Sequence, residues 1–214
     1  MTSQTTSAAS QDGSQRQQSN ATTTASQLTG HETLLSLRQS LNAGLKQYPD
    51  FPQPGILFED IFPLFADVNL HRNLIQAFLL TIEEKLGANK PDIIVGLDAR
   101  GFLIGPQLAI ALNAGFVPVR KPGKLPGVLE TVEYQKEYGT DTFAIQRDSV
   151  KPGSKVLVVD DLIATGGSAA AAETLIKNCG GELLGFVFLI ELTKLNGRSK
   201  LNGPVFTVLE SQAD

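Results

Sequence analysis

Five short apolar runs alternate with helical stretches, and this alternation restricts the fold more than any other feature of the chain. The apolar runs occupy residues 92–97, 115–119, 155–159, 182–192 and 205–209, and helical patterns cover 31–47, 70–86, 102–112 and 168–178. Within the runs, polar and apolar residues do not alternate as they do in half-exposed strands. Buried strands separated by helices typically form a parallel sheet that is covered on both faces. The sequence therefore predicts an α/β fold with a central, mainly parallel sheet flanked by helices.

The first 30 residues differ in composition from the rest of the chain. Nineteen of them are Ser, Thr or Gln, and Leu28 is the only large aliphatic residue after Met1. Such a segment cannot bury enough apolar surface to offset the entropy lost on ordering. We expect a disordered tail over 1–30 and a single domain over 31–214. A mitochondrial transit peptide is the alternative, although the segment has only one arginine and no amphipathic period.

Composition and charge argue against several classes of protein. The 18 basic and 22 acidic residues give a net charge of −4, which does not suit a chain whose main task is to bind nucleic acid. One cysteine and two histidines provide neither an internal disulfide nor a Cys/His zinc site. No apolar run approaches the roughly 18 residues of a membrane span, and a secretory signal is missing. We expect a cytoplasmic protein, with the nucleus as an additional location, that binds neither nucleic acid nor membranes.

The string after the run at 155–159 predicts a site for a phosphorylated ribose. Two carboxylates, Asp160 and Asp161, follow the run, and the turn 164–168 (ATGGS) then leads into a helix. Glycines let the backbone approach a ligand closely, and a helix N-terminus favours an anion. The carboxylates would accept hydrogen bonds from ribose hydroxyls, and the turn would hold the 5-phosphate. The residues of this predicted site are Asp160, Asp161, Ala164, Thr165, Gly166, Gly167 and Ser168.

Competing motifs do not occur in the chain. It contains no GxxxxGK[ST] string, no GxGxxG string and no GxSxG nucleophile elbow. A plain strand-to-helix turn with a serine N-cap is the alternative interpretation of ATGGS.

The string VLVVDDLIATGGS resembles the phosphoribosyl-pyrophosphate (PRPP) motif of type I phosphoribosyltransferases. Five further strings resemble the adenine phosphoribosyltransferases of that family, the fungal members in particular: FPQPGILFEDI, GLDARGFLIGP, RKPGKLPG, KEYGTDTFAIQRD and LIELTKLNGRSKL. The resemblance covers about residues 31–210 and implies a type I fold with a small hood and a flexible lid loop. It implies that adenine and PRPP give AMP and pyrophosphate, in purine salvage, and that the protein is a homodimer.

The resemblance assigns the pyrophosphate to residues that follow two predicted strands. Arg100 and Gly101 follow the first strand, and a cis peptide bond is implied at Asp98–Ala99. Fixed positive charge near the leaving pyrophosphate assists bond cleavage, so Arg100 is also a candidate catalytic residue. A surface cap is the alternative for Arg100.

A second basic group follows the strand at 115–119. Arg120, Lys121 and Lys124 lie there, and the family has matching residues near the pyrophosphate, some from the partner subunit. Solvated lysines on a loop are the alternative interpretation.

Residues 120–147 mix proline, glycine and charge with short alternating pieces, and we expect a mobile flap or hairpin. Residues 125–142 resemble the lid of the family, whose closure would exclude water from the activated ribose. The resemblance makes Glu137 the candidate acid/base residue and Tyr138 a lid contact near the pyrophosphate.

The resemblance places adenine in a hood around residues 55–60. Phe58 and Leu192 would stack on the two ring faces, while the backbone at Leu57 and Glu59 would contact the Watson–Crick edge. Many bacterial and animal members have arginine at the position of Glu59, a change that recognition through the main chain tolerates.

The implied cofactor is Mg²⁺, which would arrive with PRPP. The ion would be bound by pyrophosphate, ribose hydroxyls and water, with no direct protein ligand, and Asp160 and Asp161 would contact its water shell. Two other functions stay open: a transferase for another base, and a PRPP-binding regulator without transferase activity.

Overall fold

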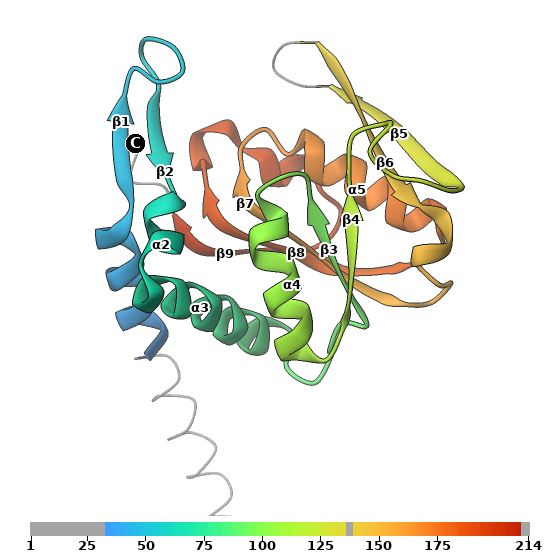
Figure 1. The fold of residues 1–214 in the computed structure, drawn as a ribbon, viewed down its shortest axis with the longest axis horizontal. Coiled ribbons are helices and arrows are strands. Elements are labelled where there is room, and N and C mark those ends of the chain that lie inside the picture. The colour runs from blue at the N-terminus through green and yellow to red at the C-terminus, as the bar shows by residue number, and fades with distance from the viewer. Residues whose placement is uncertain (1–32, 136–138, 211–214) are drawn as a thin grey trace, which may run out of the picture.

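A five-stranded parallel sheet forms the centre of the molecule (Figure 1). The computed structural model describes residues 33–135 and 139–210. The strand order is β4-β3-β7-β8-β9, and every neighbouring pair is parallel. The strands are β3 (Ile93–Leu97), β4 (Gly115–Val119), β7 (Lys155–Ile163), β8 (Glu182–Glu191) and β9 (Val205–Glu210). The predicted α/β fold with a parallel central sheet is confirmed.

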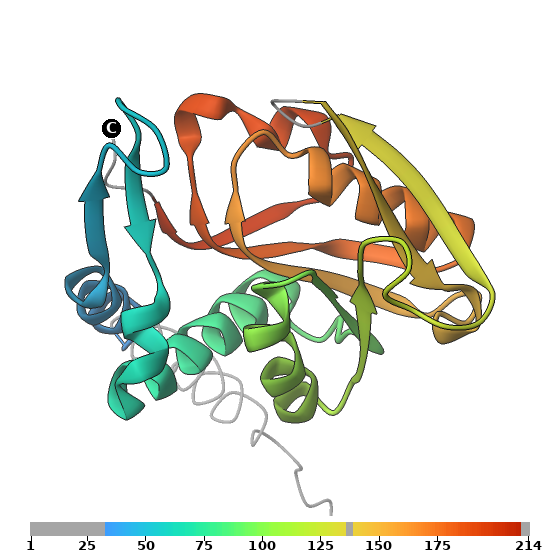
Figure 2. The ribbon, with the colours of Figure 1, turned by 45° about the horizontal axis from the view of Figure 1, so that its top comes forward.

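Helices cover the two faces of the sheet unequally (Figure 2). One face packs against helical residues 33–44 and against α2 (Phe62–Ala66), α3 (Val68–Leu86) and α4 (Gly101–Leu112). The other face packs against α5 (Gly167–Asn178) and a two-stranded hairpin. Along β3 and the first part of β7 the side chains alternate between these two cores, so that Ile94 and Leu157 face the first and Val95 and Val158 face the second.

Local sequence sets the limits of the 19-residue helix α3. The Asp67 carboxylate accepts hydrogen bonds from the backbone N–H groups of Asn69 and Leu70, at 2.8 and 2.9 Å. This N-cap satisfies donors that the helix leaves unpaired. The helix ends at Gly87, which has a φ of 54°, a conformation that glycine adopts readily.

Two small antiparallel sheets stand above the carboxyl ends of the central strands. The hood consists of β1 (Lys46–Pro49) and β2 (Leu57–Asp60), and the hairpin consists of β5 (Leu129–Gln135) and β6 (Thr140–Gln146). Figures 1 and 2 show them on opposite sides of the loop that follows β7. The hairpin predicted within 120–147 is therefore present.

Two predicted boundaries are wrong. The helix predicted over 31–47 ends at residue 44, because residues 46–49 pair with β2 instead. The strand predicted over 155–159 continues to Ile163, because the ten-residue strand β8 offers a partner along that length. Asp160 and Asp161 thus lie within β7 rather than after it.

The predicted tail over 1–30 lies outside the described residues. Across the residues that are described, no helix is long and apolar enough to cross a membrane.

Candidate active site

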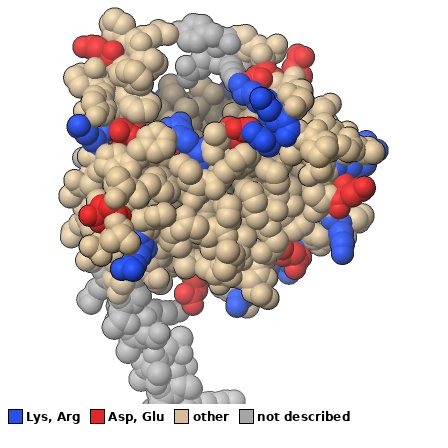
Figure 3. Space-filling view, in the orientation of Figure 1, with Lys and Arg blue, Asp and Glu red and all other residues tan. Residues whose placement is uncertain are grey.

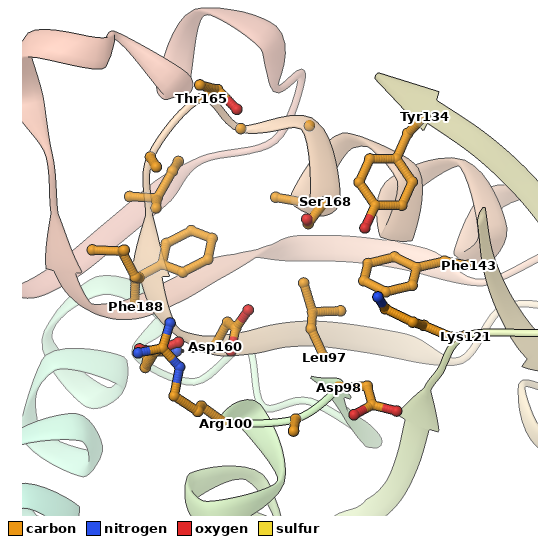
Figure 4. Close-up of a pocket in the computed structure, with 18 residues that line it drawn as sticks. Leu97, Asp98, Arg100, Lys121, Tyr134, Phe143, Asp160, Thr165, Ser168 and Phe188 are labelled. Carbon is orange, nitrogen blue, oxygen red and sulfur yellow. Dashed lines mark hydrogen bonds and ion pairs between the residues drawn. The ribbon is translucent and has the colours of Figure 1, made fainter. Parts of the chain in front are cut away.

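A cavity of about 330 Å³ lies at the carboxyl ends of β3 and β7. Ligands of open α/β sheets bind at this edge. Figure 3 shows basic and acidic side chains side by side at the hollow between the hood and the hairpin. The wall consists of Leu97, Asp98, Ala99, Arg100, Lys121, Tyr134, Phe143, the continuous segment 160–169 and Phe188 (Figure 4).

The loop after β7 offers backbone donors to the cavity. Gly166 has a φ of 77° and is the N-cap of α5, and no described side chain forms a capping hydrogen bond there. The first N–H groups of a helix lack intrahelical acceptors, so those of α5 are available to an anion. The helix begins at Gly167, so Ser168 lies in its first turn and the alternative of a serine N-cap is wrong.

Two adjacent carboxylates lie beside this loop. The backbone N–H of Asp161 donates to Oδ1 of Asp160 at 2.9 Å. Burial raises the pKa of Asp160 well above its ordinary value, and the negative charge of Asp161 adds to that effect. Burial also raises the pKa of Asp161, although the nearby Arg100 guanidinium opposes this. The pair is therefore costly to ionise without a ligand, and a cation or hydroxyl donors would favour its charged form.

Each basic side chain at the cavity has an acidic partner. Nη1 of Arg100 lies 3.0 Å from Oδ2 of Asp161, and Nζ of Lys121 lies 3.1 Å from Oδ2 of Asp141. The two cations come from separate elements, the turn after β3 and the end of β4. Both line the cavity, where an anionic ligand could replace or share their carboxylate partners.

Arg120 has a different environment from Lys121. Its Nε donates to Oδ2 of Asp98 at 3.0 Å, and its guanidinium lies 5.7 Å from the centre of the Phe102 ring. Arg120 therefore supports the turn after β3 and is not part of the cavity wall. That turn contains a cis peptide bond between Asp98 and Ala99, as the resemblance implied.

Gly101 begins α4 directly against β7. A Cβ at this position would lie 2.6 Å from the carbonyl oxygen of Val159 and 3.2 Å from Oδ1 of Asp160. The absence of a side chain thus lets the turn that carries Arg100 approach the strand that carries the two carboxylates.

The predicted site residues fall into three groups. The cavity wall contains Arg100, Lys121, Asp160, Asp161, Ala164, Thr165, Gly166, Gly167 and Ser168. Gly101, Arg120, Lys124, Leu57, Phe58, Glu59 and Leu192 lie outside that wall, and Leu57, Phe58 and Glu59 are on β2. Glu137 and Tyr138 lie outside the described residues.

The hood residues are held by contacts of their own. The rings of Phe58 and Phe51 meet edge to face with centroids 5.0 Å apart. Nε2 of Gln47 donates to Oε1 of Glu59 at 3.3 Å across the two strands. Leu57 is exposed, which leaves an apolar side chain facing solvent on the hood.

Sequence reasoning missed several residues of the wall. Tyr134 and Phe143 come from the two strands of the hairpin, with ring centroids 4.8 Å apart. Phe188 enters from β8, and Asp98 from the turn after β3. The alternation within 129–135 could have indicated that Tyr134 faces inward, but only the pairing of the two strands brings it to Phe143.

The carboxylates at the cavity indicate how the implied Mg²⁺ could be bound. Within residues 33–135 and 139–210, no group of three or more His, Cys, Asp or Glu could hold a metal ion. The two carboxylates of Asp160 and Asp161 are hard oxygen donors, which fit a Mg²⁺ ion that brings most of its ligands with its substrate.

Comparisons with known proteins agree with this geometry. A model of the phosphoribosyl transferase domain matches residues 69–214. The fold and the site thus define a phosphoribosyltransferase. The chain is 56% identical to the adenine phosphoribosyltransferase of Yarrowia lipolytica over 180 residues, which are 84% of this chain and 99% of that protein. It is 53% identical to adenine phosphoribosyltransferase 1 of Saccharomyces cerevisiae over 182 residues, 85% of this chain and 97% of that protein.

A solved structure extends the comparison to the fold. The chain resembles the crystal structure of the Saccharomyces cerevisiae adenine phosphoribosyltransferase in complex with an imino-altritol 1,6-bisphosphate and adenine. The TM-score is 0.80 at 55% sequence identity, covering 82% of this chain and 99% of that chain. The chain belongs to the adenine phosphoribosyltransferase family.

Proposed function

We propose that the cavity binds PRPP in one orientation and transfers its phosphoribosyl group to adenine. The ribose hydroxyls bind Asp160 and Asp161, and the 5-phosphate binds the loop 164–168. The pyrophosphate extends toward Arg100 and Lys121. One observation carries this proposal: a single cavity joins two carboxylates, a helix N-terminus that no described side chain caps, and two cations from other loops.

The transfer reaction determines what these groups must do. The bond from ribose C1′ to the pyrophosphate oxygen breaks, a bond from C1′ to N9 of adenine forms, and N9 loses its proton. Positive charge develops on the ribose and negative charge on the pyrophosphate, which makes fixed cations effective. Arg100 and Lys121 are held in position by Asp161 and Asp141, so they need only exchange a carboxylate for a pyrophosphate oxygen.

Adenine is assigned to the side of the cavity near the hood. Phe58 and Leu192 contact the two ring faces, and the backbone at Leu57 and Glu59 contacts the ring edge. The backbone N–H of Leu192 donates to the carbonyl oxygen of Ile163 at 2.9 Å, which ties Leu192 to the end of β7. Glu137 handles the proton, and Tyr138 contacts the pyrophosphate when the lid closes.

Mg²⁺ is the proposed cofactor, with Asp160 and Asp161 near its water shell. When bound, the ion neutralises charge on the pyrophosphate. The raised pKa values of both carboxyls support this role, because a nearby divalent cation would favour their ionised forms.

A homodimer is the proposed assembly. Leu103 and Ile110 lie on one face of α4, on either side of Gln107, and Ile110 is 84% exposed. Gln107 lines a groove with Val68 of α3, another exposed apolar residue. This apolar surface is the proposed contact between two copies. The cytoplasmic location stays a prediction from the sequence.

Two substitutions test the assigned roles against each other. Asp161→Asn should raise the KM for PRPP about tenfold or more, because it weakens the acceptor for ribose hydroxyls. Glu137→Gln should mainly lower kcat, because it removes the proton-handling group. Steady-state kinetics with each substrate varied separates the two effects. Equal, negligible changes in both variants would contradict both assignments.

A further inference from the structure

The backbone after β8 is in contact with the loop 164–168, which we call the phosphate loop. Two short turns follow that strand, η2 (Thr193–Leu195) and η3 (Gly197–Lys200). A Cβ on Gly197 would lie 2.8 Å from the backbone nitrogen of Gly166 and would collide with the carbonyl oxygen of Ala164. A Cβ on Gly166 would in turn collide with the carbonyl oxygen of Gly197. Two glycines thus bring the backbones into contact, and the position of Gly197 limits where the phosphate loop can lie.

One ion pair fixes the position of that segment. Nε of Arg198 donates to both carboxylate oxygens of Glu191, at 2.6 and 2.8 Å, and Nη2 donates to Oε2 at 2.5 Å. Nη1 also donates to the carbonyl oxygen of Val205 at 2.9 Å. The side chain of Glu191 is only 7% exposed. Such a fork-shaped, buried contact is geometrically specific, and lysine cannot reproduce it.

The ion pair between Glu191 and Arg198 joins the two ends of a short segment that contains two residues with proposed roles. Glu191 is the last residue of β8, and Leu192 and Gly197 lie between it and Arg198. Leu192 is the proposed contact with adenine, and Gly197 supports the phosphate loop. Neither Glu191 nor Arg198 lines the cavity, so neither is placed to touch the substrate.

We propose that Arg198 and Glu191 are positioning residues that set the spacing between the phosphate loop and the adenine site. The ion pair presses Gly197 against the loop and holds Leu192 at the end of β7. Loosening it lets both move, which misplaces the ribose relative to the base. This inference rests on the proposed function, because it uses the roles assigned to Leu192 and to the loop.

The test is Arg198→Lys, which keeps the charge but loses the fork. We expect the KM values for PRPP and adenine to rise together by about tenfold, with a smaller change in kcat. Glu191→Gln keeps an acceptor for Nε of Arg198 and should shift both KM values in the same direction by about threefold. This second variant keeps the test decisive if the first folds poorly.

Glu173→Gln is the matched control. Glu173 is another buried glutamate, and it accepts hydrogen bonds from the backbone N–H and Nδ2 of Asn202, at 3.2 and 3.1 Å. Glu173 therefore holds the chain just after η3, outside the segment from Glu191 to Arg198 that contains Gly197. The control should lower the melting temperature while both KM values stay within about twofold of wild type.

Two results would overturn the inference. One is wild-type KM values in folded Arg198→Lys and Glu191→Gln, and the other is an equal KM shift in the Glu173→Gln control. Failure of the proposed function gives a different result, because the wild-type protein assayed in parallel would then form no AMP.

Discussion

Alanine at Gly101 tests whether the approach of α4 to β7 sets the geometry of the site. The added Cβ would lie 2.6 Å from the carbonyl oxygen of Val159, whereas ordinary contact begins at 3.4 Å. Val159 cannot retreat easily, because its strand is paired with β3 on one side and with β8 on the other. The start of α4 must therefore move by about 0.8 Å, and Arg100 moves with it.

This displacement has expected costs in both stability and rate. Overpacking of this kind costs about 1–3 kcal/mol, which lowers the melting temperature by about 2–12 °C in a domain of this size. A shift of nearly 1 Å in a positioned group can reduce kcat/KM by up to about 10²-fold. Both quantities are measurable, by thermal unfolding and by AMP formation at 25 °C, where the variant stays folded.

Gly105→Ala is the control within the same helix. Its added Cβ would lie 2.5 Å from Cε2 of Phe116, a side chain away from the cavity wall. We expect a comparable loss of stability with kcat/KM within about threefold of wild type. Wild-type kcat/KM in Gly101→Ala, or equal losses in both variants, would show that the approach of α4 to β7 does not set the geometry of the site.

Three further substitutions give distinct outcomes. Asp160→Asn removes a carboxyl whose folded-state pKa is raised by burial and by Asp161. The stability linked to the raised pKa is present at low pH and is lost as the pH rises through that value. Asparagine carries no charge at any pH, so the variant should have a higher melting temperature than wild type at about pH 8. The difference in melting temperature should shrink toward about pH 4. Lys121→Met should raise the KM for PRPP about tenfold in steady-state assays, because a charge-assisted contact with pyrophosphate is lost. Ile110→Glu should convert a dimer to a monomer in sedimentation experiments, because it buries a charge in the proposed contact.

The central sheet was predictable because its strands are nearly continuous apolar runs. Runs such as 115–119 end where turn residues follow them, so the limits predicted from the sequence agree with the observed strand. The predicted end of β7 is wrong because Asp160 and Asp161 are polar. Only the pairing with β8 shows that the strand continues through them. Pairing with β2 also creates β1, whose first two residues the sequence presents as the end of a helix.

The phosphate loop was predictable because all its chemistry lies within one continuous string. The acidic partners of Arg100, Arg120 and Lys121 were not predictable, because each contact joins segments far apart in the chain. Asp98 is 22 residues from Arg120, and the sequence gives no sign that these two side chains meet. In the structure the Arg120 guanidinium contacts Asp98 in the turn after β3, and its role at the pyrophosphate stays a prediction.

The enzyme's choice of base provides the most direct test of the proposed function. Purified protein should be supplied with PRPP and Mg²⁺ and, separately, with adenine, hypoxanthine, guanine or orotate, and nucleotide formation should be measured. We expect AMP from adenine, no nucleotide from the other three bases, and loss of activity when Mg²⁺ is chelated. Protein that binds PRPP but forms no nucleotide with any base would contradict the proposed transferase activity and would indicate a PRPP-binding regulator.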